Sequence, residues 1–312
     1  MNRSVSPRIH YGIQAALLFG LALFTGALVK TNSLHDYLAP RTEKWMFWCP
    51  VLLGLMAVFT AYRTIAPDDD PVCGCSHEAP KSLLSKMFVY GLFILPLGLG
   101  ILLPDRALGS SAAAAKGFSY TVPLLDEHVS KDLASSAFQS GLLRQESGPG
   151  KAFLAPGNKN TELAQLAELL YAEPVIEVNP DIYAETLAAI ELFKQEFAGR
   201  TIALTGFVYK DKSIGQNGQE FAVGRFLVLC CTADALPFGV SIQLPAGMAS
   251  PEQDAWVRVT GTLKADTGGQ EGLIIDAARV VQVNQPAVPY VYSDENSHAD
   301  AVSALIQKEN AQ

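Results

Sequence analysis

Two adjacent cysteines, Cys230 and Cys231, follow an apolar run of β-type residues at 226–229, and Asp234 lies shortly after them. Two thiols and a carboxylate can bind a soft metal such as zinc or copper, and two thiols can also do redox chemistry. Because side chains alternate between the faces of a strand, we expect the thiols to point apart, one towards the core and one accessible. The alternatives are burial as small apolar residues and a disulfide, either with another cysteine or between the neighbours. For Asp234, a turn or capping role competes with metal binding.

A second cluster lies between two apolar segments, where Cys73, Cys75 and His77 follow a run of aspartates. Gly74 lets the backbone fold back, so these three side chains could converge on one zinc or copper ion. The spacing is not that of a zinc knuckle, and no second ligand pair follows. A mobile polar loop that binds nothing is therefore the competing interpretation.

Sequence patterns that identify the common enzyme classes are missing. The chain has no phosphate-binding P-loop, no zinc-protease helix motif, no nucleophile elbow and no dinucleotide fingerprint after a strand. We therefore predict that the protein is not an enzyme.

The elements that must position these residues begin with a membrane region. The chain has 312 residues, of which 49% are hydrophobic and only 17% are charged, and the apolar excess lies in the first third. Three segments, 10–29, 45–62 and 87–103, approach the length of about 20 residues needed to cross a bilayer. We predict three transmembrane helices without an ionisable side chain inside them, which argues against an ion pathway through these helices alone.

The distribution of positive charges gives little information on how these helices are oriented in the membrane. Lys and Arg residues near the predicted spans divide equally, five on each side of the membrane, so the positive-inside rule is silent. The first segment is too long for a signal-peptide core and lacks a small-x-small cleavage site. We expect an uncleaved anchor in a bacterial-type plasma (inner) membrane, with the N-terminus inside and the C-terminal domain extracytoplasmic.

Composition and periodicity divide the chain into five parts. Residues 1–104 form the predicted three-helix membrane region, and 105–158 read as an Ala/Ser/Gly-rich linker, which could include a short helix. Residues 159–198 form a connector, with helices at about 161–171 and 181–198 around a short strand. Residues 199–292 form a β domain, and 293–312 a polar tail.

The β domain has five alternating, β-branched runs separated by turn residues. We predict strands at 201–209, 221–230, 238–244, 256–263 and 273–283. Five such strands fit a small all-β barrel of the OB type, with a mixed sandwich as the alternative. The residues 245–254 fall where many OB folds insert a helix. The predicted fold is thus a membrane-anchored α plus β chain with a helical linker and an OB-like module.

Four segments in this chain carry a family resemblance: GFVYK at 206–210, RFLVLCCTADA at 225–235, WVRVTGTL at 256–263 and PYVY at 289–292. They resemble, in order, the C-terminal module of the YcgQ-like family of two-component permease subunits, and 95–117 resembles that family's last span and exit. The resemblance implies a small membrane protein that acts beside a larger multispanning permease of unknown substrate. The four segments also contain residues that we add to the candidate site, either as partner-binding or as structural positions: Arg225, Phe207, Tyr209, Trp256, Tyr290 and Tyr292. Arg225 could face outwards and pair with Asp234, or contact the permease.

The charge of the β domain argues against nucleic acid as a partner. Residues 199–292 contain seven bases and eight acids, whereas nucleic-acid binding requires a basic surface. Two hypotheses follow from the sequence. The chain is an accessory subunit of a membrane permease complex, or it is a membrane-tethered protein that senses or carries a soft metal or uses its thiols.

Overall fold

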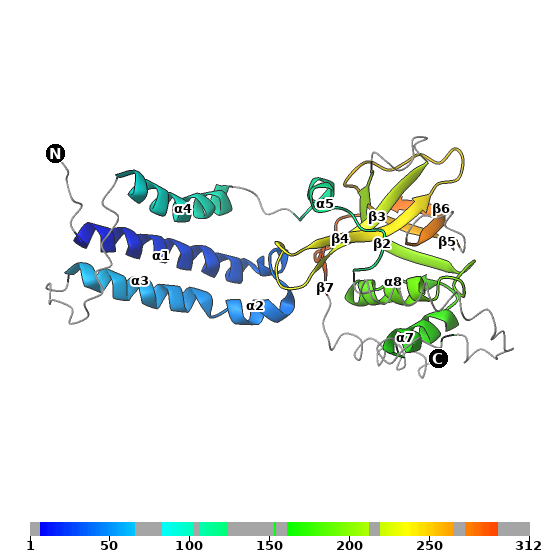
Figure 1. Cartoon of the computed structure of the whole chain (residues 1–312), viewed down its shortest axis with the longest axis horizontal. Coiled ribbons are helices and arrows are strands. Elements are labelled where there is room, and N and C mark those ends of the chain that lie inside the picture. Colours follow the sequence, from blue (N-terminus) through cyan, green and yellow to red (C-terminus); the bar gives the residue numbers. More distant parts are fainter. Residues whose placement is uncertain are drawn as a thin grey trace. The chain divides into compact units, whose positions relative to one another are not determined.

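The computed structural model describes residues 7–65, 83–102, 107–123, 153, 161–211, 219–264 and 272–292. The chain divides into two compact units, Met1–Arg106 and Ala107–Gln312. The first contains helices, and the second contains a β-barrel with helices and connecting segments (Figure 1).

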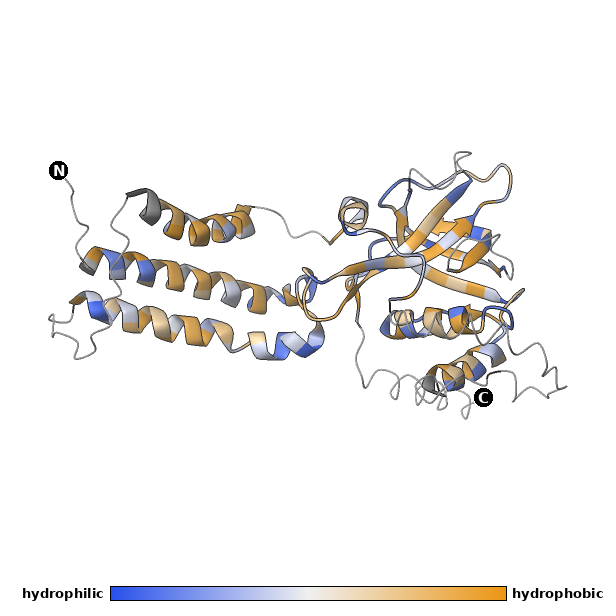
Figure 2. Ribbon diagram, viewed as in Figure 1, coloured by the Kyte–Doolittle hydropathy of each residue, from blue (hydrophilic) through white to orange (hydrophobic). Residues whose placement is uncertain are grey.

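Four α-helices build the N-terminal unit within the described residues: α1 (Pro7–Thr31), α2 (Pro40–Met46), α3 (Cys49–Ile65) and α4 (Leu83–Leu102), with a short 3-10 turn η1 (Leu34–Asp36) after α1. Apolar residues predominate along α1, α3 and α4, whereas α2 is largely hydrophilic (Figure 2). Two stretches, Ile9–Thr31 and Pro40–Ile65, are long and apolar enough to cross a membrane. Only 11% and 6% of their most apolar parts are buried, so they are unlike the core helices of a soluble protein. The apolar part of α4, Met87–Leu102, is shorter, so the third predicted span stays a prediction.

Small side chains occupy the buried positions of α1 and α3. Ala15, Ala22 and Thr25 are the buried positions of α1, and Ala57 is the buried position of α3. In lipid, where apolar burial alone does not drive association, small residues let helix backbones approach and gain dispersion contacts. Residues of this size at the buried positions are compatible with such close packing, and a Cβ on Gly26 of α1 would lie 3.7 Å from Pro50 of α3.

The second predicted span is divided into two helices. The α-helix is interrupted at residues 47–48, directly before Cys49 and Pro50 in the first turn of α3. Pro50 has no backbone N–H to donate to the preceding turn, and its ring fits best in the first turn of a helix. The interruption therefore lies where this proline begins the next helix. In contrast, α4 continues through Pro96.

Helix α4 runs parallel to α1. Tyr90 hydrogen-bonds His10 near the start of both helices, and a Cβ on Gly100 would lie 2.7 Å from the ring of Phe24 near their ends. The contact near the start of α1 is with the start of α4, and the contact near the end of α1 is with the end of α4, so the two helices run in the same direction. A larger side chain at position 100 would therefore force the Phe24 ring to move.

Five strands in the second unit close into a barrel: β2 (Thr201–Tyr209), β3 (Glu220–Val228), β4 (Leu236–Gln243), β5 (Trp256–Leu263) and β6 (Ile274–Gln282). They hydrogen-bond in the order β2-β5-β6-β4-β3, and an additional pairing of β2 with β3 closes the ring. All pairings around the ring are antiparallel except that of β4 with β6. This is a five-stranded Greek-key barrel of the OB type. The predicted barrel is confirmed and the sandwich alternative is wrong.

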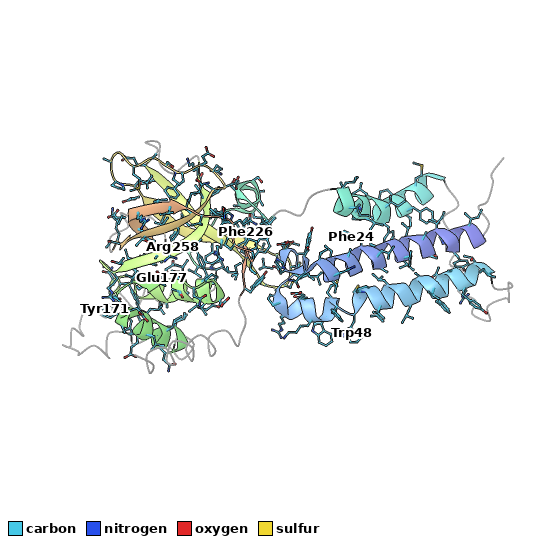
Figure 3. All side chains as sticks on the ribbon, turned by 180° about the vertical axis from the view of Figure 1, so that it is seen from behind. Phe24, Trp48, Tyr171, Glu177, Phe226 and Arg258 are labelled. Atoms are coloured by element: carbon cyan, nitrogen blue, oxygen red, sulfur yellow. The ribbon has the colours of Figure 1, made fainter. Side chains whose placement is uncertain are left out.

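Two short strands extend the sheet beyond the barrel. Strand β1 (Ile176–Glu177) pairs parallel to β2, and β7 (Val291–Tyr292) pairs parallel to β3. Arg258 of β5 binds both carboxylate oxygens of Glu177 at 2.5 and 2.7 Å, and Figure 3 shows the two side chains together. Both are about half exposed, so the ion pair contributes little to stability.

Helices close one side of the barrel core. Helix α7 (Thr161–Ala172) matches its prediction, whereas the second predicted helix is shorter than expected: a 3-10 turn η3 (Pro180–Ile182) leads into α8 (Tyr183–Leu192). Buried side chains of α8, such as Leu187 and Ile190, belong to the same apolar core as the strand interiors. Residues 245–254, where we expected a helix insertion, form turns instead. The helices that pack against the barrel core therefore precede the barrel strands in the sequence.

Part of the predicted linker is folded onto the barrel. Residues 107–123 include α5 (Ser110–Lys116), and Asp254 accepts hydrogen bonds from the backbone N–H and hydroxyl of Ser110 at 2.5 and 2.8 Å. The ring of Phe118 stacks on Tyr209 at 4.6 Å, beside a glycine, Gly224, whose added Cβ would meet that ring at 2.7 Å. The Ala, Ser and Gly content of this stretch does not predict such long-range contacts, because small residues occur both in close packing and in flexible linkers.

Candidate functional site

The cysteine pair lies in a turn and not at the end of a strand. Strand β3 ends at Val228, so the alternation of a strand no longer applies to the thiols. Backbone hydrogen bonds from Asp234 to Cys231 (3.0 Å) and from Ala235 to Thr232 (3.3 Å) tighten the turn. The two sulfurs are 3.7 Å apart. The expectation that the thiols point apart, with one in the core, is therefore wrong.

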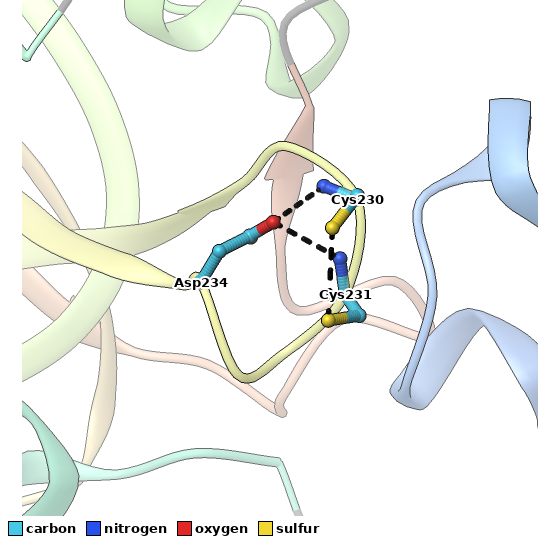
Figure 4. A group of neighbouring side chains, drawn as sticks. All are labelled: Cys230, Cys231 and Asp234. Atoms are coloured by element: carbon cyan, nitrogen blue, oxygen red, sulfur yellow. Dashed lines mark hydrogen bonds between the residues drawn. The ribbon is translucent and has the colours of Figure 1, made fainter.

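The carboxylate of Asp234 organises this turn (Figure 4). Its Oδ1 accepts the backbone N–H of Leu229 at 3.0 Å, and its Oδ2 accepts those of Cys230 at 2.8 Å and Cys231 at 3.3 Å. An Asp side chain that bonds nearby backbone N–H groups stabilises a turn. The predicted turn role of Asp234 is confirmed, and the same bonds hold the carboxylate beside both thiols.

Three potential metal ligands therefore converge in one loop. One ligand atom from each of Cys230, Cys231 and Asp234 lies within 4.8 Å of the other two. Cys230 is exposed, whereas the other two are partly buried. Neither cysteine forms a disulfide. We call this group the Cys-Cys-Asp loop.

Hydrogen bonds within the loop shift the pKa values of Cys230 and Asp234. The hydrogen bond to the Asp234 carboxylate, followed by that to Cys231, raises the pKa of the Cys230 thiol to about 12. Partial burial would raise the pKa of Asp234, but hydrogen bonds from the Cys230 thiol and from the turn backbone outweigh it and lower that pKa. Cys230 is thus a thiol at neutral pH, which makes it a poor nucleophile, since the thiolate is the reactive form.

Arg225 does not face outwards. Its side chain is 1% exposed, and it alternates with Val223 and Leu227, which belong to the barrel core. The guanidinium carbon lies 5.5 Å from the ring centre of Tyr183 and 5.3 Å from that of Trp256. Burial lowers the pKa of Arg225, and the neighbouring Tyr183 opposes this shift. The predicted surface pairing with Asp234 is wrong, because the alternation of β3 directs position 225 inwards.

The aromatic residues of the recognised motifs pack on the barrel. Phe207 stacks on Phe226 at 5.3 Å and meets the edge of Trp256, while Phe226 contacts Tyr290. Tyr209 is covered by Phe118, and the Tyr290 hydroxyl accepts the backbone N–H of Leu108 at 3.0 Å. Tyr292 ends β7 and is partly buried. The rings of Phe207, Tyr209, Trp256 and Tyr290 are engaged in internal packing, so they are not presented for stacking on nucleic-acid bases.

The second predicted ligand cluster cannot be placed. Cys73, Cys75 and His77 lie outside the described residues, so their convergence stays a prediction.

A polar contact in the membrane unit escaped the sequence analysis. Tyr90 hydrogen-bonds one ring nitrogen of His10, and the Gln14 side chain contacts the other at 3.1 Å. His10 lies inside the candidate span Ile9–Thr31, which corrects the expectation that no ionisable residue lies in a span. The signal was the spacing of His10 and Gln14, four residues apart on one helical face.

The groove beside this contact is mainly apolar. It encloses about 300 Å³ between α1 and α4, and it is lined by Gln14, Leu17, Leu18, Leu21, Val89, Tyr90 and Phe93. Its polar end therefore coincides with the Tyr90 contact.

Comparison with known proteins extends over both units. Residues 13–119 match the DUF1980 N-terminal domain, and residues 154–293 match the DUF1980 C-terminal domain. The chain is 26% identical over 294 residues to "UPF0703 protein YcgQ" of Bacillus subtilis, which covers 88% of this chain and 97% of that protein. It is 24% identical over 220 residues to a Streptococcus mutans protein named "Putative two-component membrane permease complex subunit", covering 70% and 77%. The resemblance inferred from four short motifs is confirmed.

Proposed function

Because this chain belongs to the DUF1980 family, we propose that it is the accessory subunit of a membrane permease complex and partners a larger multispanning permease. Support comes from the name of the Streptococcus mutans relative, a subunit of a two-component membrane permease complex. The substrate of such a complex is not encoded in any motif of this chain.

The exposure of the apolar helices carries the proposal. The two long apolar stretches bury only 11% and 6% of their most apolar parts within the chain. A bundle of two or three helices exposes most of its apolar surface to lipid or to the helices of a partner. It is also too small to enclose a transport pathway. A partner with more spans would supply the pathway, and the apolar surfaces would bind it through close dispersion contacts.

We include α4 as a third span in this proposal. Its 20 residues extend over about 30 Å, the thickness of the hydrocarbon core. Its parallel run beside α1 and its uncharged sequence from Met87 onwards support a membrane position. Three spans would put the barrel on the side opposite the N-terminus, which we propose is the extracytoplasmic side of the plasma membrane.

The barrel would act as a docking or substrate-handling module. A closed five-stranded barrel with its own apolar core is a rigid platform, and its loops are free to meet a partner or cargo. A second candidate function, a membrane-tethered protein that handles a soft metal, is favoured by the convergence of Cys230, Cys231 and Asp234.

Copurification tests the subunit role. The full chain carries an affinity tag and is expressed at its natural level, crosslinked in intact cells, and purified in a mild detergent. We expect one multispanning membrane protein in constant ratio to the tagged chain, and absent when an unrelated tagged membrane protein is purified in the same way. Absence of any such partner, with and without crosslinking, would contradict the proposal.

Accessibility labelling tests the orientation separately. A membrane-impermeant maleimide added in excess to intact cells should label the cysteine pair, although slowly at Cys230, because that thiol is exposed but its raised pKa leaves little thiolate. A Cys230→Ser, Cys231→Ser variant should lose that label. Labelling that appears only after the cells are permeabilised would place the barrel in the cytoplasm.

A further inference from the structure

We propose that the Cys-Cys-Asp loop is an open, three-ligand binding site for a thiophilic divalent cation of the zinc class. The site exchanges its ion and does not hold it as a structural element. It is formed by Cys230, Cys231 and Asp234, whose ligand atoms already lie within 4.8 Å of one another.

The distance between the sulfurs fits tetrahedral coordination. Two sulfurs that are each about 2.3 Å from a tetrahedral ion are about 3.8 Å apart, and the two thiols are 3.7 Å apart. A disulfide would require about 2.0 Å, whereas linear coordination at the same bond length would require about 4.6 Å. An ion can therefore enter between the two sulfurs with little movement of the loop.

The turn backbone holds this geometry before an ion arrives. The three backbone N–H groups that Asp234 accepts fix the carboxylate and both cysteine backbones in one arrangement. A site whose ligands are ordered in advance loses less conformational entropy when it binds. Asp234 therefore has two roles, since it forms the turn and supplies the third ligand.

Binding would replace protons by the ion. Each thiol loses its proton to water and forms a sulfur–metal bond, and one carboxylate oxygen forms the third bond. Two thiolates, one carboxylate and a divalent cation leave a net charge of minus one. A water molecule or an incoming donor takes the fourth position, as in zinc sites that keep an open position.

The surroundings favour exchange over a structural role. Structural zinc sites are closed by four protein ligands, whereas three meet here among the residues that the structure describes. Cys230 is exposed, so a donor can reach the ion from solvent. The barrel also has an extensive apolar core of its own, which can stabilise the fold without a structural ion. Transfer of the ion to or from a permease rests on the proposed subunit function, but binding of the ion does not.

Metal titration of the purified full chain tests the site. The chain is kept reduced in detergent, stripped with a chelator, and titrated with zinc against a chromophoric competitor. Cobalt(II) then replaces zinc, because a thiolate-to-cobalt charge-transfer band reports sulfur ligation directly. The parent chain carries Cys73→Ser, Cys75→Ser and His77→Ala, so that these neighbouring candidate ligands do not contribute.

We expect one zinc ion per chain and a cobalt–thiolate band. Cys230→Ser and Cys231→Ser should each weaken zinc binding at least tenfold and diminish the band. Cys49→Ser, a half-buried cysteine of the membrane unit, is the matched control and should leave both unchanged. Equal elution and circular dichroism spectra would show that the variants are folded. Zinc binding that is absent from the parent chain, or unchanged in both loop variants, would overturn the site.

Copurification of the cysteine variant distinguishes failure of the metal site from failure of the proposed subunit role. The Cys230→Ser, Cys231→Ser variant should still bring down the multispanning partner, because the exposed helices carry that contact. Loss of metal binding with the partner retained would support both proposals. Metal binding without any partner would leave the site intact and overturn only the subunit role.

Discussion

The Nε of Arg225 donates a 3.0 Å hydrogen bond to the backbone carbonyl of Thr205 inside the barrel, although the arginine side chain is only 1% exposed. Its Nη1 has no hydrogen-bond partner among the described residues. The two aromatic rings beside the guanidinium supply cation–π attraction in place of a carboxylate. A buried cation held in this way costs desolvation free energy, so its stabilising contribution comes mainly from filling space.

Replacing this arginine should separate its charge from its volume. We expect Arg225→Ala to lower the free energy of unfolding by about 3 kcal/mol, because truncation leaves a cavity in the core. Arg225→Met fills similar space without a charge, and it should be neutral or stabilising. Thermal unfolding of the purified chain measures both. A large loss in the methionine variant would show that the charge itself is needed.

Asp254 should fasten the segment after the membrane helices to the barrel. Its carboxylate accepts two hydrogen bonds from Ser110 at the start of α5. We expect Asp254→Ala to cost about 1 to 2 kcal/mol and to speed amide hydrogen exchange within 110–116. Glu177→Gln, which weakens an exposed ion pair, is the control and should change neither quantity appreciably. Unchanged exchange in the alanine variant would contradict the capping role.

The contact between Tyr90 and His10 should stabilise the packing of α4 on α1. Removing the hydroxyl in Tyr90→Phe leaves the ring in place and deletes the interhelical hydrogen bond. We expect a loss of about 0.6 kcal/mol, or up to about 2, as for other hydrogen bonds between membrane helices. Thermal unfolding in detergent measures the loss, and Tyr11→Phe provides a control on the neighbouring position. Equal stability of both variants would show that the contact adds nothing.

Asp234 should order the cysteine turn even without metal. Three backbone N–H groups lose their acceptor in Asp234→Ala, so we expect a cost of about 1 to 2 kcal/mol, most of it local. Faster amide exchange at 229–231, measured in the presence of a chelator, would report the loosened turn. Asp234→Asn keeps one acceptor oxygen and should show an intermediate effect. Identical exchange in all three proteins would rule out this role.

Local patterns were sufficient for the elements themselves. The β5 strand was predicted with its exact observed limits because alternating residues at 256–263 are bounded by turn residues, and β2 likewise at 201–209. In each case the physical cause acts within a few residues, so the sequence is enough to see it.

The sequence alone therefore determined the apolar helices, the five barrel strands, the residue types that could bind a metal and the family. Only the tertiary structure decided that Cys230 and Cys231 lie side by side, that Arg225 is buried, and that residues 107–123 lie on the barrel. The thiols meet because Asp234 bends the chain after Val228, and a strand pattern cannot locate where a strand ends in a turn. The other two depend on contacts between residues distant in the chain, Arg225 with Tyr183 and Ser110 with Asp254. Such contacts form only when the barrel closes.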